Sequence, residues 1–310
     1  MHRTDPLLHS DSDGRRPTSA SIMATLGLPD FETPSACEKR QRALRAALGD
    51  SPEGQIIARD LADCARDGCR RDACDDACYF AAARRRSRLI RHAHGLLVQH
   101  NGPLLLATIE HPNWEAPVGG LAGTGTQGPR EWIKRRLESL FNAADVIAVG
   151  QFERALNVKL DGSSSWSGEV HVVVAGASKE QLRDAFGIAR RYHRDPQEKL
   201  HHVKAVHGLG RALGHALTYF LARRVAYITN TGRQGRRSMP LQREQLAELG
   251  AWHASLKSGE RVVLFGCRRH GGGLVTTTRR HCARDAYAIM EFARALDSEI
   301  ESVRAAILDE

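Results

Sequence analysis

The clearest alternation of apolar and polar residues lies in the middle of the chain, in SGEVHVVVAG at residues 167–176. Every second residue there is a valine, and side chains two apart on a strand share a face. Glu169 and His171 therefore share the opposite face of a predicted strand. Residues 104–110 are almost uniformly apolar and predict a buried strand, and residues 152–160 alternate. The latter segment turns back into residues 167–176, which predicts a β-hairpin.

Helical spacing of apolar residues surrounds these strands. Pro129 suits the first position of one helix, and Ser178 with Gln181 predicts a capping box at the start of another. Helices are predicted over residues 38–48, 52–63, 81–97, 130–142, 178–192, 208–222, 241–256 and 283–308. Strands and helices interleave without a strict βαβ order. This pattern predicts an α+β fold with a central, mostly antiparallel sheet flanked by helices.

Changes in composition divide the 310 residues into four predicted parts. Residues 1–36 are rich in Ser, Asp, Pro, Thr and Arg without a period, which predicts a disordered basic and polar tail. Residues 37–100 form a helical module with a cysteine cluster and a basic helix. Residues 101–282 contain the sheet, and residues 283–310 form a C-terminal helix.

The charge of the chain favours a polyanionic partner. Lys and Arg number 45 against 36 Asp and Glu, which gives a formal net charge of +9. The arginines occur in clusters, and the guanidinium group pairs bidentately with phosphate, so nucleic acid is the expected partner. A codon bias that enriches Arg and Ala is the alternative explanation. The arginines predicted to contact DNA are Arg84, Arg85, Arg86, Arg223, Arg224, Arg236 and Arg237.

Two further patterns concern location. The sequence contains no run of about 18 apolar residues, so no membrane-spanning helix and no membrane partner are expected. The first residues also lack the apolar core of a signal peptide. We therefore expect a cytoplasmic protein, in which cysteines serve as thiols or metal ligands more often than as disulfides.

Four of the seven cysteines lie within fifteen residues. Cys64, Cys69, Cys74 and Cys78 have the spacing C-x4-C-x4-C-x3-C, and four thiolates this close in sequence can close a tetrahedral Zn²⁺ site. A helix that happens to be rich in cysteine is the alternative. The other three cysteines, Cys37, Cys267 and Cys282, are interpreted as structural or incidental.

Glu169 and His171 are the candidate ligands of a second metal. A carboxylate with an imidazole on one face of a rigid strand suits Mg²⁺ or Mn²⁺. A polar, solvent-facing strand edge is the alternative. The segment at 123–128 matches G-x-G-x-x-G, but no strand leads directly into it and it lacks the Lys-Ser/Thr of a phosphate loop, so we interpret it as a loop.

The order of these features resembles the rolling-circle replication initiators of plasmids and phages, in the HUH endonuclease superfamily. The resemblance covers roughly residues 60–270: a cysteine cluster, an Arg-rich helix, a hairpin (GQFERALNVKLDG), the strand EVHVVVAG, and a later helix with Tyr219. It implies a ferredoxin- or RRM-like sheet in which Glu169 and His171 bind Mg²⁺ or Mn²⁺. Tyr219 would attack a phosphodiester of single-stranded origin DNA. A host helicase would be a further partner.

The chain departs from that family at three places. Glu169 stands where the family has the first His of His-hydrophobic-His. No Lys follows Tyr219 at the third position on, and the cysteines lack a C-x2-C pair. These departures leave open a catalytically inactive DNA-binding protein, such as a replicon regulator, on the same fold. A zinc-bearing RNA-binding protein is a third hypothesis, although only 5% of residues are aromatic and few could stack bases.

Overall fold

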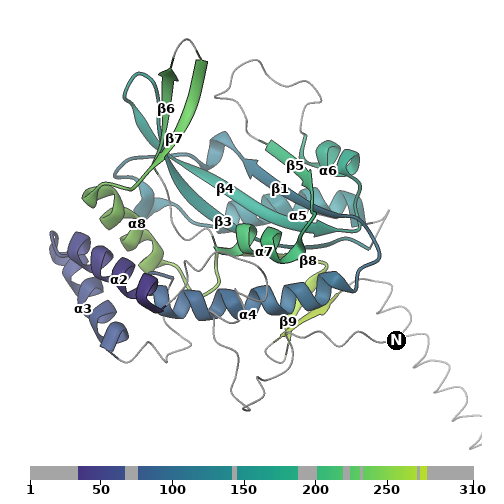
Figure 1. Cartoon of the computed structure of the whole chain (residues 1–310), viewed down its shortest axis with the longest axis horizontal. Coiled ribbons are helices and arrows are strands. Elements are labelled where there is room, and N and C mark those ends of the chain that lie inside the picture. The colour runs from purple at the N-terminus through teal and green to yellow at the C-terminus, as the bar shows by residue number, and fades with distance from the viewer. Residues whose placement is uncertain are drawn as a thin grey trace, which may run out of the picture.

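The computed structural model describes residues 34–66, 76–141, 145–187, 201–218, 224–230, 233–270 and 273–277. Its centre is an eight-stranded, mostly antiparallel sheet with the order β5-β1-β4-β3-β6-β7, to which β2 adds beside β4 and β8 beside β3 (Figure 1). The sheet strands are β1 Leu104–Glu110, β2 Ala116–Pro117, β3 Ile147–Val158, β4 Ser164–Ala175, β5 His201–Ala205, β6 Arg224–Asn230, β7 Arg233–Met239 and β8 Val262–Phe265. A separate pair is formed by β9 Cys267–His270 and β10 Gly273–Thr276.

Helices pack around this sheet, which confirms the predicted α+β class. They are α2 Pro34–Leu48, α3 Pro52–Arg66, α4 Tyr79–Val98, α5 Gln127–Phe141, α6 Lys179–Phe186, α7 Leu209–Thr218 and α8 Arg243–Ser255, with 3-10 turns at Pro112–Trp114 and Leu121–Gly123. Over the described segments, none of them combines the length and the apolarity that crossing a bilayer requires. Most of the predicted tail over residues 1–36 and the predicted C-terminal helix lie outside the described residues, but residues 34–36 begin helix α2 and are not part of a tail.

The hairpin of β3 and β4 is the backbone of the sheet. Its register runs without interruption from Ile147 opposite Ala175 to Val158 opposite Ser164, which confirms the predicted hairpin. The strand predicted over residues 152–160 begins earlier in the structure, because β3 runs continuously from Ile147 to Val158. Gly162 in the connecting turn has φ of 83°, a conformation that glycine adopts without steric cost.

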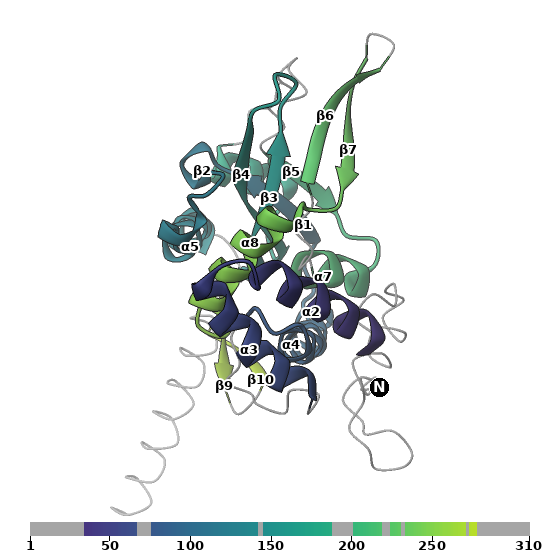
Figure 2. The ribbon, with the colours of Figure 1, turned by 90° about the vertical axis from the view of Figure 1, so that its left-hand side faces the viewer.

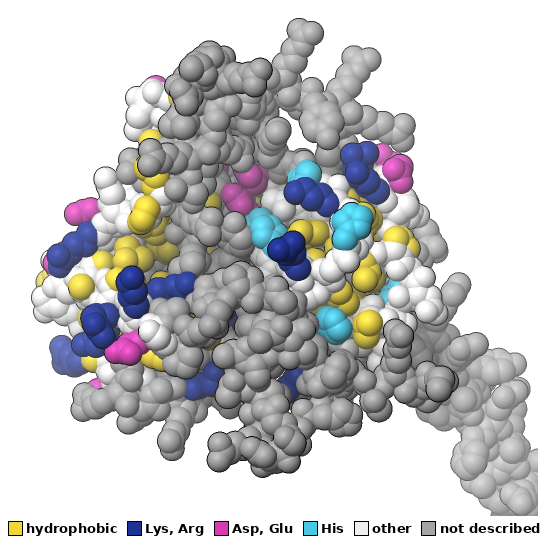
Figure 3. Space-filling model, viewed as in Figure 1, with side chains coloured by type: hydrophobic (Ala, Val, Ile, Leu, Met, Phe, Trp, Pro, Cys, Tyr) yellow, Lys and Arg dark blue, Asp and Glu magenta, His cyan; other side chains and the backbone are white. Residues whose placement is uncertain are grey.

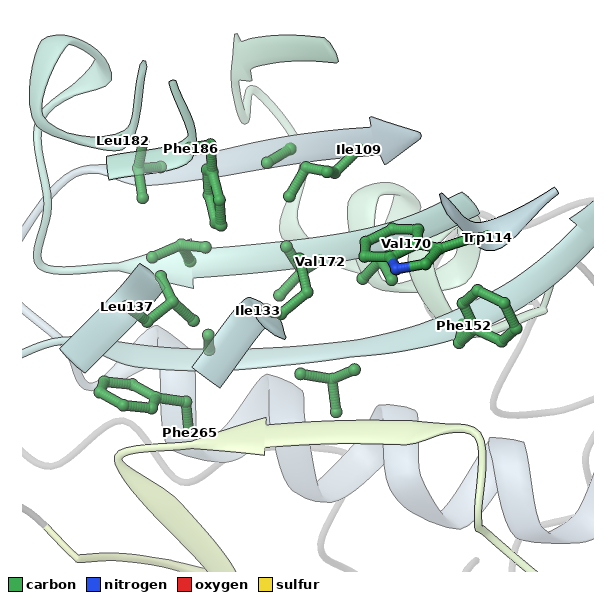
Figure 4. Packing of buried hydrophobic residues seen from close by; sticks show 14 of the residues in the cluster. Ile109, Trp114, Ile133, Leu137, Phe152, Val170, Val172, Leu182, Phe186 and Phe265 are labelled. Carbon is green, nitrogen blue, oxygen red and sulfur yellow. The ribbon is translucent and has the colours of Figure 1, made fainter. Parts of the chain in front are cut away.

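The two faces of the sheet are covered differently, as the edge-on view in Figure 2 shows with α5 and α7 on opposite sides. The even-numbered valines of β4 join a core with apolar residues of α5, α6 and α8, such as Ile133, Leu182 and Leu249. Figure 4 shows this packing around Val170 and Val172. The opposite face is covered by α4 and α7. The alternation in the sequence therefore predicted the faces of β4 correctly.

Helix α4 connects the sheet to the N-terminal helices. Its second half, with Ile90 and Leu97, packs under the sheet, whereas its first turns pack with α2 and α3 around Cys37 and Cys78. Helix α8, from the other end of the chain, also packs on this N-terminal core. The predicted boundary near residue 100 thus follows a helix that contributes to two cores.

Strands β6 and β7 form a ribbon that extends beyond the rest of the sheet (Figures 1 and 2). Only the parallel register from Leu156 opposite Arg224 to Val158 opposite Ala226 joins it to β3. The sequence predicted a basic loop over residues 230–240, and this prediction was wrong because Arg233–Met239 forms a strand. The strand contains a glycine and mostly charged or polar residues, so it lacks the apolar alternation by which a strand is recognised in a sequence. A two-stranded ribbon can form without an apolar face.

Candidate active site

Glu169 and His171 lie side by side on the central strand β4, on the face that α4 and α7 cover. The Oε2 of Glu169 lies 3.2 Å from the Nε2 of His171. The side chains are 20% and 5% exposed respectively, so the carboxylate remains accessible from solvent while the ring is held by its neighbours. The pairing that alternation predicted on one strand face is therefore present.

Contacts on both sides fix the orientation of the His171 ring. Nδ1 lies 3.0 Å from the hydroxyl oxygen of Thr108, which is its cross-strand neighbour on β1. The ring of His215, from α7, packs edge-on against it with centroids 4.8 Å apart. Metal-binding histidines usually form a hydrogen bond through the ring nitrogen that does not hold the metal, and the contact of Nδ1 with Thr108 is of that kind.

Two more glutamates flank Glu169 in the sheet. Glu110 on β1 and Glu153 on β3 are each its direct cross-strand partner, so three carboxyl groups lie in one row on this face. Like charges directly opposite one another destabilise a sheet. A row of this kind therefore favours binding of a positive charge or a proton.

The environment shifts the titration of two groups around the pair. Burial raises the pKa of Glu153 well above its usual range, and the nearby charge of Glu169 raises it further, while Arg261 opposes the shift. Burial also lowers the pKa of His215 to about 4, helped by His171 and Lys204. The neutral form of His215 therefore dominates near neutral pH.

The separation of the pair fits a divalent cation. Two adjacent ligands of an octahedral ion, each about 2.1 Å from it, are about 3 Å apart. The 3.2 Å between Oε2 and Nε2 is close to that value. Within the described part of the chain, no group of three His, Cys, Asp or Glu side chains could hold a metal. Mg²⁺ commonly binds one or two protein groups and completes its shell with water and substrate phosphate, so a two-residue site suits it.

The predicted nucleophile Tyr219 and Arg223 lie outside the described residues, and for Arg224, Arg236 and Arg237 the backbone alone is described. Helix α7 ends at Thr218, the residue before Tyr219 in the chain.

Two of the α4 arginines that the sequence predicted to contact DNA, Arg85 and Arg86, lie largely inside the protein. Arg86 is only 5% exposed, and Arg85 donates to Asp76 at 2.9 Å, so both point into the protein. Arg84 is half-buried. Because α4 lies between two cores, its arginines form contacts with buried polar groups of the protein as well as with solvent.

Two of the four predicted zinc ligands are described. Cys64 and Cys78 are buried in the core between α2, α3 and α4, together with Cys37, while Cys69 and Cys74 lie outside the described residues. The Sγ of Cys78 also accepts from the backbone N–H of Ala81 at 3.5 Å and so caps α4. The zinc site stays a prediction.

A buried polar chain next to the site was missed by sequence reasoning. Arg261 donates from Nε to Asp76 at 2.9 Å, and its Nη1 reaches the amide oxygen of Gln151 at 2.9 Å. Gln151 lies opposite His171 in the register of β3 and β4. Asp76 and Arg261 are 185 residues apart, and no local pattern marks such a pair. Glu110 could have been found, since it lies two residues after Thr108 in an apolar strand.

No family model, curated protein or solved structure matches this chain.

Proposed function

We propose that the protein binds and nicks single-stranded DNA at a replication origin, with Tyr219 as nucleophile and a Mg²⁺ or Mn²⁺ ion held by Glu169 and His171. The role is that of a rolling-circle initiator of a plasmid or phage. The observation that carries the proposal is the Glu169–His171 pair, 3.2 Å apart on the central strand and oriented by Thr108.

The chemistry needs what this face offers. A phenol with a pKa near ~10 is a weak nucleophile at neutral pH, so its attack on a phosphodiester requires charge neutralisation at the phosphate. A bound divalent cation supplies that neutralisation. Attack by the Tyr219 oxygen on phosphorus breaks the bond to the 3′-oxygen, which gains a proton. The products are a 5′-phosphotyrosyl link and a free 3′-hydroxyl.

The place of α7 supports the proposal. This helix packs on the face of the sheet that carries the pair, and its His215 ring contacts His171. Tyr219 follows His215 by four residues in the sequence. Thr218, the last residue of α7, therefore directly precedes the proposed nucleophile in the sequence.

A covalent adduct is the decisive test. Purified full-length protein is incubated with single-stranded DNA from the surrounding replicon and Mn²⁺, and resolved on a denaturing gel. We expect an adduct with the wild type, none with Tyr219→Phe, and a reduced amount with Glu169→Ala. Tyr192→Phe is the matched control and should behave as the wild type. An adduct that survives Tyr219→Phe but not Tyr192→Phe would move the nucleophile to Tyr192.

One observation favours a second candidate, a DNA-binding protein without nicking activity. Among the described residues, no third His, Cys, Asp or Glu is placed so that it could hold a metal together with Glu169 and His171. Under this alternative, DNA binding persists and falls with salt, and no variant or cation yields an adduct. The same gel, combined with a binding titration, separates the two candidates.

A further inference from the structure

The edge of the sheet beside the candidate metal site carries a line of positive and imidazole side chains. Strand β5 is the edge strand and pairs with β1, so that His202 lies opposite Thr108 and Lys204 opposite Leu106. Thr108 shares its face of the sheet with His171. By the alternation of strands, His202 and Lys204 therefore project on the same face as Glu169 and His171.

Helix α7, which covers this face of the sheet, contributes a further positive side chain. Arg211 lies one turn before His215, and residues four apart on a helix are neighbours on its surface. Lys204 projects on the face of the sheet that α7 covers. Lys204 from the strand and Arg211 from the helix thus lie on the same side of the sheet as His215, which contacts His171.

The side chains of this edge are exposed to solvent. His202, Lys204, His207 and Arg211 are all exposed. Neither Lys204 nor Arg211 forms an ion pair with any of the described residues, in contrast to Arg85 and Arg261. Figure 3 shows histidine and Lys or Arg side chains gathered over β5 and α7, with acidic side chains next to them.

The acidic row beside the metal pair and the basic β5–α7 edge lie a short distance apart. Neighbouring strands lie about 4.8 Å apart, so β5 is about 10 Å from β4, with β1 between them. The row of Glu110, Glu169 and Glu153 repels a phosphate unless a cation is bound there. The edge formed by β5 and α7 attracts phosphates with or without that cation.

We infer that the β5–α7 edge, through Lys204 and Arg211 with His202 and His207 beside them, binds the backbone phosphates of the single-stranded DNA that flanks the nicked position. The inference rests on the proposed function for its choice of polyanion. Contacts to phosphate oxygens position a strand without reading its sequence. The edge therefore serves to lead the strand across β1 to the metal pair.

The test measures binding of a fluorescent 20-nucleotide oligo(dT) to the full-length protein by anisotropy, in EDTA, over a series of KCl concentrations. Each phosphate contact contributes about 0.7 to the slope of log K against log salt for single strands. Lys204→Ala/Arg211→Ala should reduce that slope by about 1.4 and weaken binding about 25-fold at about 0.1 M salt. Lys204→Arg/Arg211→Lys should bind as the wild type does.

A matched control removes two cations from the opposite side of the sheet. Lys134 and Arg135 lie on α5, which covers the other face (Figure 2). Lys134→Ala/Arg135→Ala should leave both the affinity and the slope unchanged. Wild-type affinity in Lys204→Ala/Arg211→Ala, or an equal loss in the α5 control, overturns the inference.

The outcome is distinguishable from that of the nicking proposal. Binding of Lys204→Ala/Arg211→Ala is measured in EDTA, where neither the metal ion nor Tyr219 is needed, so its outcome does not depend on nicking. If this variant binds DNA more weakly and no protein forms an adduct, DNA binding by the β5–α7 edge is supported and the nicking proposal is refuted. If the wild type forms an adduct and the variant binds DNA as the wild type does, only the inference about the edge is refuted.

Discussion

The buried ion pair of Asp76 and Arg261 gives the sharpest test of how the N-terminal helices are joined to the sheet. Asp76 precedes α4, Arg261 precedes β8, and their side chains are 7% and 4% exposed. Arg85 donates to the second oxygen of the same carboxylate. Replacing Asp76 by Asn keeps the shape of the side chain and removes the charge that both guanidinium groups face.

The expected magnitude follows from the pKa of Asp76. Burial opposes ionisation, but Arg261 and Arg85 outweigh it and lower the pKa from 3.8 to about 2. At 1.36 kcal/mol per pKa unit, a difference of nearly two units corresponds to about 2 kcal/mol. An uncompensated partner charge in the interior typically costs about 3–5 kcal/mol. Asp76→Asn should therefore lower the free energy of unfolding by between about 2 and 5 kcal/mol at neutral pH.

The sign with pH is fixed by the same shift. A carboxyl group whose pKa is lower in the folded protein stabilises it above the unfolded pKa, and this contribution is lost as the pH falls towards the folded value. The stability difference between wild type and Asp76→Asn should therefore be constant above pH 5 and shrink between about pH 4 and pH 2.

Urea unfolding followed by tryptophan fluorescence measures the difference, because the tryptophans lie in or against the core of the sheet. Glu38→Gln is the matched control. Its partner is Arg42, in a pair whose side chains are 58% and 75% exposed. Exposed pairs contribute up to about 1 kcal/mol. An Asp76→Asn protein within about 1 kcal/mol of the wild type would refute the reasoning that this buried ion pair stabilises the folded protein.

Three further predictions concern single residues. Burial lowers the pKa of His253 well below 6.5, so the folded protein should lose stability as the pH falls below about 6.5. In His253→Gln, the midpoint of urea unfolding should therefore change less between pH 7 and pH 5 than it does in the wild type. In Gly168→Ala the added Cβ would lie 2.6 Å from the Cβ of Trp114, which should cost about 1–3 kcal/mol and lower the thermal midpoint; an unchanged midpoint would contradict this packing. Thr108→Val removes the hydroxyl that orients His171, so calorimetry should show Mn²⁺ affinity reduced about 10- to 100-fold, whereas equal affinity would exclude an orienting role.

Local patterns carried the predictions that proved correct. The valine alternation set the faces of β4, and Ser178 with Gln181 forms the predicted capping box of α6. Helix boundaries were less well predicted. Helix α6 ends at Phe186 rather than near residue 192, because Gly187 adopts a left-handed conformation and caps it. Helix α5 begins before Pro129, because proline is tolerated throughout the first turn of a helix, where a backbone N–H has no partner within the helix.

The sequence could predict only the part of the candidate site that lies on a single strand. Glu169 and His171 share a face by alternation alone, which a single sequence reveals. Glu110 and Glu153 join them through the register of three strands, and Lys204 joins them through the pairing of the edge strand β5 with β1. These neighbours depend on pairing between distant segments. Charge counts along the chain could not distinguish exposed arginines from Arg86, which is buried.

Helix α4 lies in two cores, and this has a consequence for how the molecule opens. Its first turns pack with α2 and α3, and its last turns pack beneath the sheet beside α7. Separating the N-terminal helices from the sheet would expose apolar residues of α4 on one side or the other. We therefore expect the amide protons of α4 to exchange with solvent as slowly as those of β3 and β4, in a single cooperative unit. A protease that cuts within α4 would have to wait for the whole protein to unfold.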